Sequence, residues 1–243
     1  MSKRTWVLIN GWSMPDCLWQ PIQEANPNPV ISLTLPDVAS FEECVDLLLA
    51  QAPADSLWLG WSLGGRLAMA AAAREASQVD AHKVSERKVA GVLTMAATPT
   101  FVANQSTLGL SAETLQHFIH GMSAQPELTL RQFQRLVVKG ADDRATTLKA
   151  IAGEPLPYSF DLLSQQLHWL APDHEALWQQ AAAYCPCLHL AGGKDALVPV
   201  SRYQQEFVGM GQVAIHEAAG HVLHWPDAAV LLAGCQLLEA SVE

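Results

Sequence analysis

Short apolar runs alternate with helical patterns along the first hundred residues. The runs are almost wholly apolar, as expected of strands that are buried on both faces of a parallel sheet. They lie at residues 6–9, 30–35, 57–59 and 89–97. Between them, residues 41–52 and the alanine-rich residues 67–76 have helical spacing. The alternation predicts an α/β fold with a mostly parallel sheet, flanking helices and right-handed crossovers.

The pattern changes between about residues 101 and 180, where we predict no strand. Helical patterns recur there at residues 111–122, 128–139, 142–151, 158–170 and 174–183. Strand patterns return at 187–191 and 213–217, and a last helix is expected at 227–238. We therefore expect an α/β core made of residues 1–100 and 181–243, with residues 101–180 inserted over the sheet as a helical lid.

The most specific pattern is Gly60-Trp61-Ser62-Leu63-Gly64, a Gly-x-Ser-x-Gly motif between a predicted strand and a predicted helix. The turn is tight, so side chains at its two glycines would clash. It places the Ser62 hydroxyl beside a helix N-terminus, which favours a developing anion. A glycine-rich turn with an incidental serine has the same five residues, so the nucleophile hypothesis depends on the rest of the chain.

A serine nucleophile needs a histidine base and an acid that orients the base. Asp195 follows the strand predicted at 187–191, and His221 follows the next predicted strand. His216 lies within that strand, and His224 precedes the last helix, so both are weaker candidates. Asp195 alone could be a turn or helix-capping residue. The order Ser62, Asp195, His221 favours a catalytic triad.

An oxyanion formed at Ser62 would need hydrogen-bond donors. We predict the backbone N–H groups of Leu63, directly after the nucleophile, and of Trp12, in the loop after the first strand. The Trp12 indole either lines the substrate pocket or packs in the core.

Composition excludes several other classes of protein. The net charge of -10 argues against nucleic-acid binding. Five scattered cysteines predict reduced thiols, with no disulfide framework and no zinc site. No apolar stretch is long enough for a signal sequence or a membrane span, so we expect a cytoplasmic protein without membrane association. The proposed chemistry needs no metal or organic cofactor, and we expect a monomer.

These motifs resemble the α/β-hydrolase superfamily and, more narrowly, the BioH-type pimeloyl-[acyl-carrier protein] methyl ester esterases of biotin synthesis. The segments that carry the resemblance are residues 58–65, 10–12 and 218–226. It implies a serine carboxylesterase that cleaves the methyl ester of a pimeloyl chain held on acyl-carrier protein. Four features depart from the family. Asn10 replaces a histidine, the loop at residues 35–40 is short, the segment at residues 77–88 is lengthened, and we expect the usual N-terminal strand and hairpin to be absent.

The predicted lid is locally basic. Residues 128–150 contain five Lys/Arg and two Asp, a net charge of +3. Arg131 and Arg135 stand four apart, on one helical face. Resemblance to the family implies that these arginines dock the acidic carrier protein, and we expect three neighbours to touch the acyl chain: Leu136, Val137 and Val138. A solvated helix face would have the same pattern.

Other activities are compatible with the same triad. They are a thioesterase, a small-ester carboxylesterase and a lyase similar to the synthase of the menaquinone pathway. A non-catalytic binding module on a hydrolase scaffold is a further alternative, which an intact triad disfavours.

Overall fold

The computed structural model describes residues 3–78, 87–103 and 109–242, and the structural statements that follow concern these residues. One six-stranded sheet has the order β2-β1-β3-β4-β5-β6, and every neighbouring pair is parallel. The strands are β1 (Trp6–Ile9), β2 (Val30–Leu33), β3 (Ser56–Trp61), β4 (Val89–Met95), β5 (Cys187–Gly192) and β6 (Gln212–His216). The predicted α/β fold and its strands are confirmed to within a few residues.

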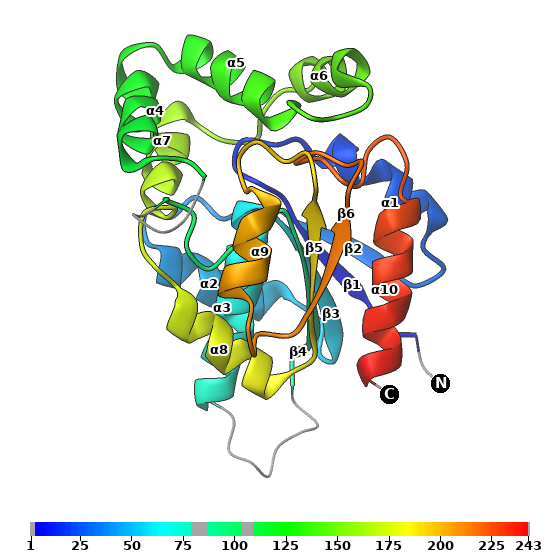
Figure 1. Cartoon of the computed structure of the whole chain (residues 1–243). Helices are drawn as coiled ribbons and strands as arrows, with labels where there is room; N and C mark the ends of the chain where they lie inside the picture. Colours follow the sequence, from blue (N-terminus) through cyan, green and yellow to red (C-terminus); the bar gives the residue numbers. More distant parts are fainter. Residues whose placement is uncertain (1–2, 79–86, 104–108, 243) are drawn as a thin grey trace.

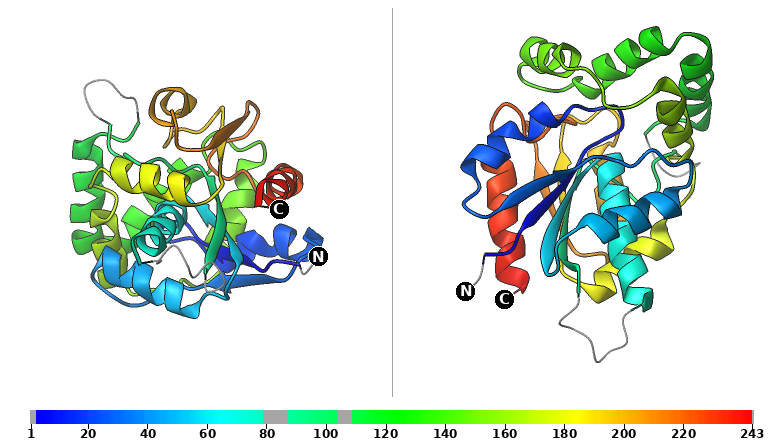
Figure 2. Two further views of the ribbon diagram at one scale, coloured as in Figure 1. Left: turned by 90° about the horizontal axis from the view of Figure 1, so that it is seen from below. Right: turned by 180° about the vertical axis from the view of Figure 1, so that it is seen from behind.

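Helices cover both faces of the sheet (Figures 1 and 2). On one face lie α1 (Gln20–Ala25), which continues a 3-10 turn, η1 (Asp16–Trp19), and α10 (Ala229–Val242). On the other lie α2 (Phe41–Gln51), α3 (Leu63–Gln78) and α8 (Glu175–Tyr184). The central strands β3 and β4 are buried along their whole length, which explains why their sequences are mostly apolar.

Four further helices lie above the carboxyl ends of the strands (Figure 1). They are α4 (Ala112–Ala124), α5 (Pro126–Val137), α6 (Arg144–Gly153) and α7 (Phe160–His168). We call α4 to α7 the helical cap. The chain enters it after β4 and returns through α8, which packs against α3 beside the sheet. The domain boundaries at residues 100 and 180 stay a prediction.

Two segments differ from the sequence pattern or lie beyond the described residues. The pattern missed α9 (Val200–Glu206), a short helix in which Arg202 and Tyr203 are buried. Residues 77–88 are polar and charged, a pattern typical of a loop or a frayed helix end; α3 continues to Gln78, and residues 79–86 lie outside the described part of the chain. Among the helices described, none combines the length and apolar character needed to cross a bilayer.

Candidate active site

Ser62 lies between the last residue of β3 and the first residue of α3. Its backbone is in the left-handed region, with φ of 54°, which non-glycine residues seldom adopt. The Ser62 N–H donates to the Met95 carbonyl at 2.8 Å, and its own carbonyl accepts from the N–H of Gly65 at 3.0 Å. Backbone strain of this kind persists where the surrounding structure enforces it, and it is concentrated at functional sites.

The two motif glycines allow this turn to form. A Cβ added to Gly60 would lie 2.3 Å from the carbonyl oxygen of Gly64. A Cβ added to Gly64 would lie 2.2 Å from the carbonyl oxygen of Ile9, at the end of β1. Both contacts are with backbone, which cannot rotate away as a side chain could. Glycine is therefore needed at both positions, as the sequence predicted.

Asp195 and His221 form a buried hydrogen-bonded pair. The Nδ1 atom of His221 lies 2.8 Å from Oδ2 of Asp195, and both side chains are almost fully buried. The other carboxylate oxygen, Oδ1, accepts from the backbone N–H groups of Leu197 at 2.8 Å and Val198 at 3.0 Å. Because the carboxylate accepts at Nδ1, a neutral His221 carries its proton there and presents Nε2 as an acceptor. This is the tautomer that a general base requires.

A hydrogen bond ties the nucleophile turn to the histidine loop. Trp61, directly before Ser62, donates its indole Nε1 to the His221 carbonyl at 2.9 Å. The same indole contacts His224 edge-on at 4.8 Å between ring centroids, and His224 stacks on Trp19 at 4.5 Å. Burial lowers the pKa of His224 to about 3, so this ring is neutral and packs as an aromatic group. The structure thus brings the turn of Ser62 and the loop of His221 together.

The loop after β1 passes against Ser62. A Cβ added to Gly11 would lie 3.3 Å from the Cβ of Ser62, so the loop that carries Trp12 adjoins the nucleophile turn. The Trp12 indole is buried, donates Nε1 to the Leu163 carbonyl of α7 at 2.8 Å, and packs edge-on against Phe133 of α5 at 4.6 Å. The side chain packs between the loop and the cap, and a role of its indole in lining the substrate pocket stays a prediction. Trp12 joins the loop to the cap.

Asn10, which stands where the resembled family has histidine, points toward the start of η1. Its side chain is buried, and Nδ2 donates to the Asp16 carboxylate. Within the described residues, its Oδ1 has no hydrogen-bond partner. Asn10 therefore fixes the segment that follows the loop of Trp12.

The predicted cap residues divide into two groups. Arg131 and Arg135 are exposed on α5, and Arg131 lies 3.9 Å from the Glu127 carboxylate on the same helix. Leu136 is half-buried, whereas Val137 and Val138 are buried in the apolar interior. The helix is therefore basic outside and apolar inside.

The sequence reasoning missed a buried arginine on α3. The guanidinium of Arg66 donates to the carbonyls of Thr98 and Pro99, where the chain leaves β4, at 3.2 and 2.8 Å. It also donates to the carbonyls of Trp169 and Pro172, where the chain leaves α7, at 3.4 and 2.7 Å. Burial lowers its pKa to about 10, which still leaves it charged at neutral pH. A charged residue within the apolar, alanine-rich run was the available signal.

A second buried arginine binds the same part of the chain, the segment between β4 and the helical cap. Arg202 of α9 donates to the carbonyls of Phe101, at 2.9 Å, and Thr100, and it pairs with Glu206 at 2.7 Å. The two arginines thus fix the chain at the base of the cap.

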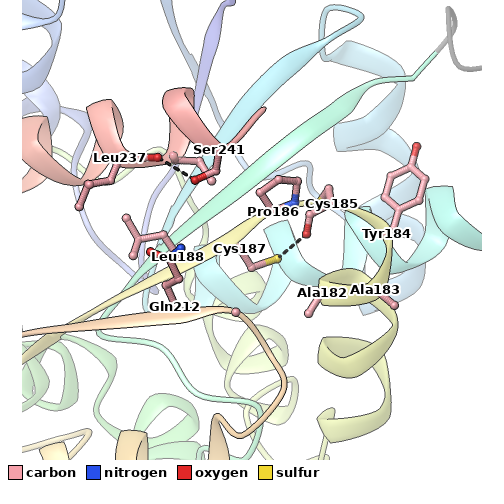
Figure 3. Close-up of a pocket in the computed structure, with 12 residues that line it drawn as sticks. Ala182, Ala183, Tyr184, Cys185, Pro186, Cys187, Leu188, Gln212, Leu237 and Ser241 are labelled. Atoms are coloured by element: carbon pink, nitrogen blue, oxygen red, sulfur yellow. Dashed lines mark hydrogen bonds between the residues drawn. The ribbon is translucent and has the colours of Figure 1, made fainter. Parts of the chain in front are cut away.

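The described residues offer no other centre of comparable chemistry. They contain no group of three or more His, Cys, Asp or Glu side chains able to hold a metal ion, and all five cysteines are free thiols. A cavity of about 410 Å³ lies near Cys185 and Cys187, and Figure 3 shows residues that line it. It lies at the amino end of β5, at the opposite edge of the sheet from Asp195, and the Cys187 thiol points to the Cys185 carbonyl at 3.4 Å.

Comparison with protein families identifies the family to which the chain belongs. A family model described as "Alpha/beta hydrolase family" matches residues 6–233. The chain belongs to the alpha/beta hydrolase family. Solved structures share the fold: the bromoperoxidase from Bacillus anthracis has a TM-score of 0.76 at 17% identity, over 98% of this chain and 92% of that one. An esterase from Exiguobacterium antarcticum has a TM-score of 0.73 at 13% identity, over 100% of this chain and 93% of that one.

Several curated relatives narrow the class within this hydrolase family. The chain is 31% identical to the pimeloyl-[acyl-carrier protein] methyl ester esterase of Serratia marcescens, over 81% of this chain and 78% of that protein. It is 29% identical to the same-named protein of Aliivibrio salmonicida, over 88% of this chain and 84% of that protein. The biotin biosynthesis bifunctional protein BioHC of Saccharophagus degradans is also 29% identical, and the matched part is 42% of its length, against 92% of this chain. These relatives confirm the resemblance and the predicted enzyme class, a carboxylic ester hydrolase.

Proposed function

We propose that this hydrolase cleaves the methyl ester of a pimeloyl chain carried on acyl-carrier protein, with Ser62 as nucleophile, His221 as base and Asp195 as the residue that orients the base. The buried Asp195–His221 pair, 2.8 Å apart, carries the proposal. It gives an imidazole of fixed orientation and tautomer, in a loop that Trp61 ties to the turn of Ser62. The choice of substrate is supported by relatives whose names specify that ester.

The reaction has two halves. His221 accepts the proton of Ser62 as the hydroxyl oxygen attacks the ester carbonyl, and it then protonates the departing methanol. Asp195 stabilises the imidazolium, and the backbone N–H groups of Leu63 and Trp12 donate to the oxyanion. His221 then deprotonates a water molecule, which attacks the acyl-enzyme. As the acyl–oxygen bond breaks, His221 returns the proton to the Ser62 oxygen and the acid is released. No step requires a metal or an organic cofactor.

The cap, within the predicted lid at residues 101–180, is proposed to receive the carrier protein. Arg131 and Arg135 are exposed on α5 and four residues apart, so an acidic partner can meet both. The apolar side of the same segment offers Leu136, Val137 and Val138 to the acyl chain. A protein with net charge -10 otherwise repels an acidic partner, so local basic charge is needed for docking.

The nucleophile is tested with Ser62→Ala and a fluorophosphonate probe. The wild-type protein should be labelled and should release methanol from methyl pimeloyl-carrier protein, and Ser62→Ala should do neither while keeping its fold. Ser123→Ala, an exposed serine on α4, serves as control. Labelling of Ser62→Ala equal to wild type would contradict the assignment. Absence of labelling in the wild type would favour a binding module.

The substrate is tested with a panel of esters. Methyl pimeloyl-carrier protein should have a higher kcat/KM than free methyl pimelate, short esters and acyl thioesters. Arg131→Gln combined with Arg135→Gln should remove the advantage of the carrier and spare the free ester. Arg4→Gln with Arg74→Gln removes two positive charges elsewhere and should change neither. Faster thioester cleavage would instead support a thioesterase.

A further inference from the structure

The turn that leaves α5 contacts the loop of Asp195 through its backbone. Gly140 lies in this turn, with φ of +92°, in a region that glycine adopts without strain. A Cβ added there would lie 2.2 Å from the carbonyl oxygen of Lys194. Lys194 directly precedes Asp195, so the cap rests on the backbone next to the proposed acid. In Figure 1 the connection from α5 to α6 lies above the loops after β5 and β6.

The same turn contacts the loop of His221. A Cβ added to Gly220 would lie 2.8 Å from the carbonyl carbon of Gly140 and 2.9 Å from the backbone nitrogen of Ala141. Gly220 directly precedes His221. One cap turn therefore adjoins the residues that precede both members of the proposed acid–base pair.

The two catalytic loops are also packed backbone on backbone. A Cβ added to Gly192 would lie 2.2 Å from the carbonyl oxygen of Gly220. The Lys194 N–H donates to the Ala219 carbonyl at 2.9 Å, across the two loops. Contacts between backbones cannot be relieved by rotating a side chain, so a displacement of any one of the three segments must move the others.

We propose that Gly140 is a positioning residue for the esterase reaction: through Lys194 and Gly220, the cap turn sets the alignment of Asp195 and His221. The inference rests on the proposed function of that pair. Gly140 touches no reacting atom in this mechanism. It also follows that a displacement of α5, the helix proposed to receive the carrier protein, is transmitted to the catalytic loops through this turn.

Gly140→Ala tests the proposal, and the chain supplies two matched controls. Gly209→Ala places alanine in a backbone conformation similar to that of Gly140, with φ of +77°, but its added Cβ has no neighbouring atom within 4 Å. Gly153→Ala has neither a positive φ nor a neighbour within 4 Å. Gly209→Ala thus isolates backbone strain from contact with the catalytic loop.

We expect Gly140→Ala to lower kcat on a short activated ester on the order of tenfold to a hundredfold, with KM within about twofold, because small misplacement of catalytic groups costs this much. Both controls should keep kcat within about twofold. In proton NMR, the downfield resonance of the His221 Nδ1 proton, assigned by its loss in His221→Gln, should shift or disappear in Gly140→Ala and persist in the controls. Thermal unfolding shows that each variant compared is folded.

Equal kcat and an unshifted resonance in folded Gly140→Ala would overturn the proposal. If that variant does not fold, Gly220→Ala is the deciding variant, because the added Cβ overlaps less with Gly140 and the backbone at Gly220 has no positive φ. The same loss of kcat and the same change in the resonance are expected in Gly220→Ala. Wild-type values in this variant would overturn the proposal. If the wild-type protein cleaved no ester, the proposed function would fail, and the NMR comparison would still decide the alignment of Asp195 and His221.

Discussion

Arg66→Met should destabilise the protein by an amount that its hydrogen bonds allow us to calculate. The guanidinium is buried and donates to four backbone carbonyls, two of them at 2.8 Å and 2.7 Å. Methionine fills much of the volume of the arginine stem but leaves those carbonyls without a donor. An orphaned buried acceptor costs about 1–3 kcal/mol. Counting only the two short bonds, we expect a loss of about 3 kcal/mol in the free energy of unfolding.

The measurement is thermal unfolding beside a matched control. In a chain of this size, 1 kcal/mol shifts Tm by about 2–4 °C, so Arg66→Met should lower Tm by about 6–12 °C. Arg74→Met makes the same substitution on the same helix, at a part-exposed residue whose guanidinium lies 3.3 Å from Asp46. That pair is worth about 1 kcal/mol or less, so the control should move by less than about 4 °C.

Equal Tm shifts in the two variants would contradict this prediction, because they would show that the hydrogen bonds of the four carbonyls to the guanidinium do not stabilise the fold. The location of the Arg66 hydrogen bonds leads to a second expectation. They join the chain entering the cap to the chain leaving it. Loss of activity in Arg66→Met at a temperature well below its Tm would show that this anchorage also matters for the site.

Two other substitutions probe the acid–base pair and the core. Asp195→Asn should lower kcat on the order of 10³–10⁴-fold with the fold retained, because an amide does not hold the required tautomer of His221; loss no larger than in the exposed Asp227→Asn control would contradict this. Burial lowers the pKa of His189 to about 4, below its value of about 6.5 in the unfolded chain. The contribution of neutral His189 to the free energy of unfolding is therefore full above about pH 6.5 and is lost as the pH falls toward 4. The free energy of unfolding should therefore fall less between pH 7 and pH 4 in His189→Gln than in the wild type, by a difference on the order of 3 kcal/mol. Urea unfolding at both pH values measures this decrease. An equal decrease in variant and wild type would contradict the prediction.

The sheet and the chain order of the proposed catalytic residues could be predicted from the sequence. Buried parallel strands need unbroken apolar runs, and such runs can be recognised without knowing their partners. The turn of Ser62 was recognisable because its two glycines avoid backbone clashes that are local to one strand–turn–helix unit. Asp195 and His221 were predictable from their positions directly after strands, since the carboxyl ends of parallel strands share one edge of the sheet.

The contacts that hold these segments in place could not be predicted from the sequence, because they form between distant parts of the folded chain. Arg66 and Arg202 bond to carbonyls about thirty to more than a hundred residues away along the chain, and a carbonyl has no sequence signature. The packing of Trp12 against α7 depends on where the cap lies, which no local pattern specifies. Gly140 is one of fifteen glycines, and its contact with Lys194 exists only once the cap is folded over the sheet. The conformation of a tight turn depends on residues that are adjacent in the sequence, so it can be predicted from them. The alignment of the site depends on contacts between segments that are distant in the chain.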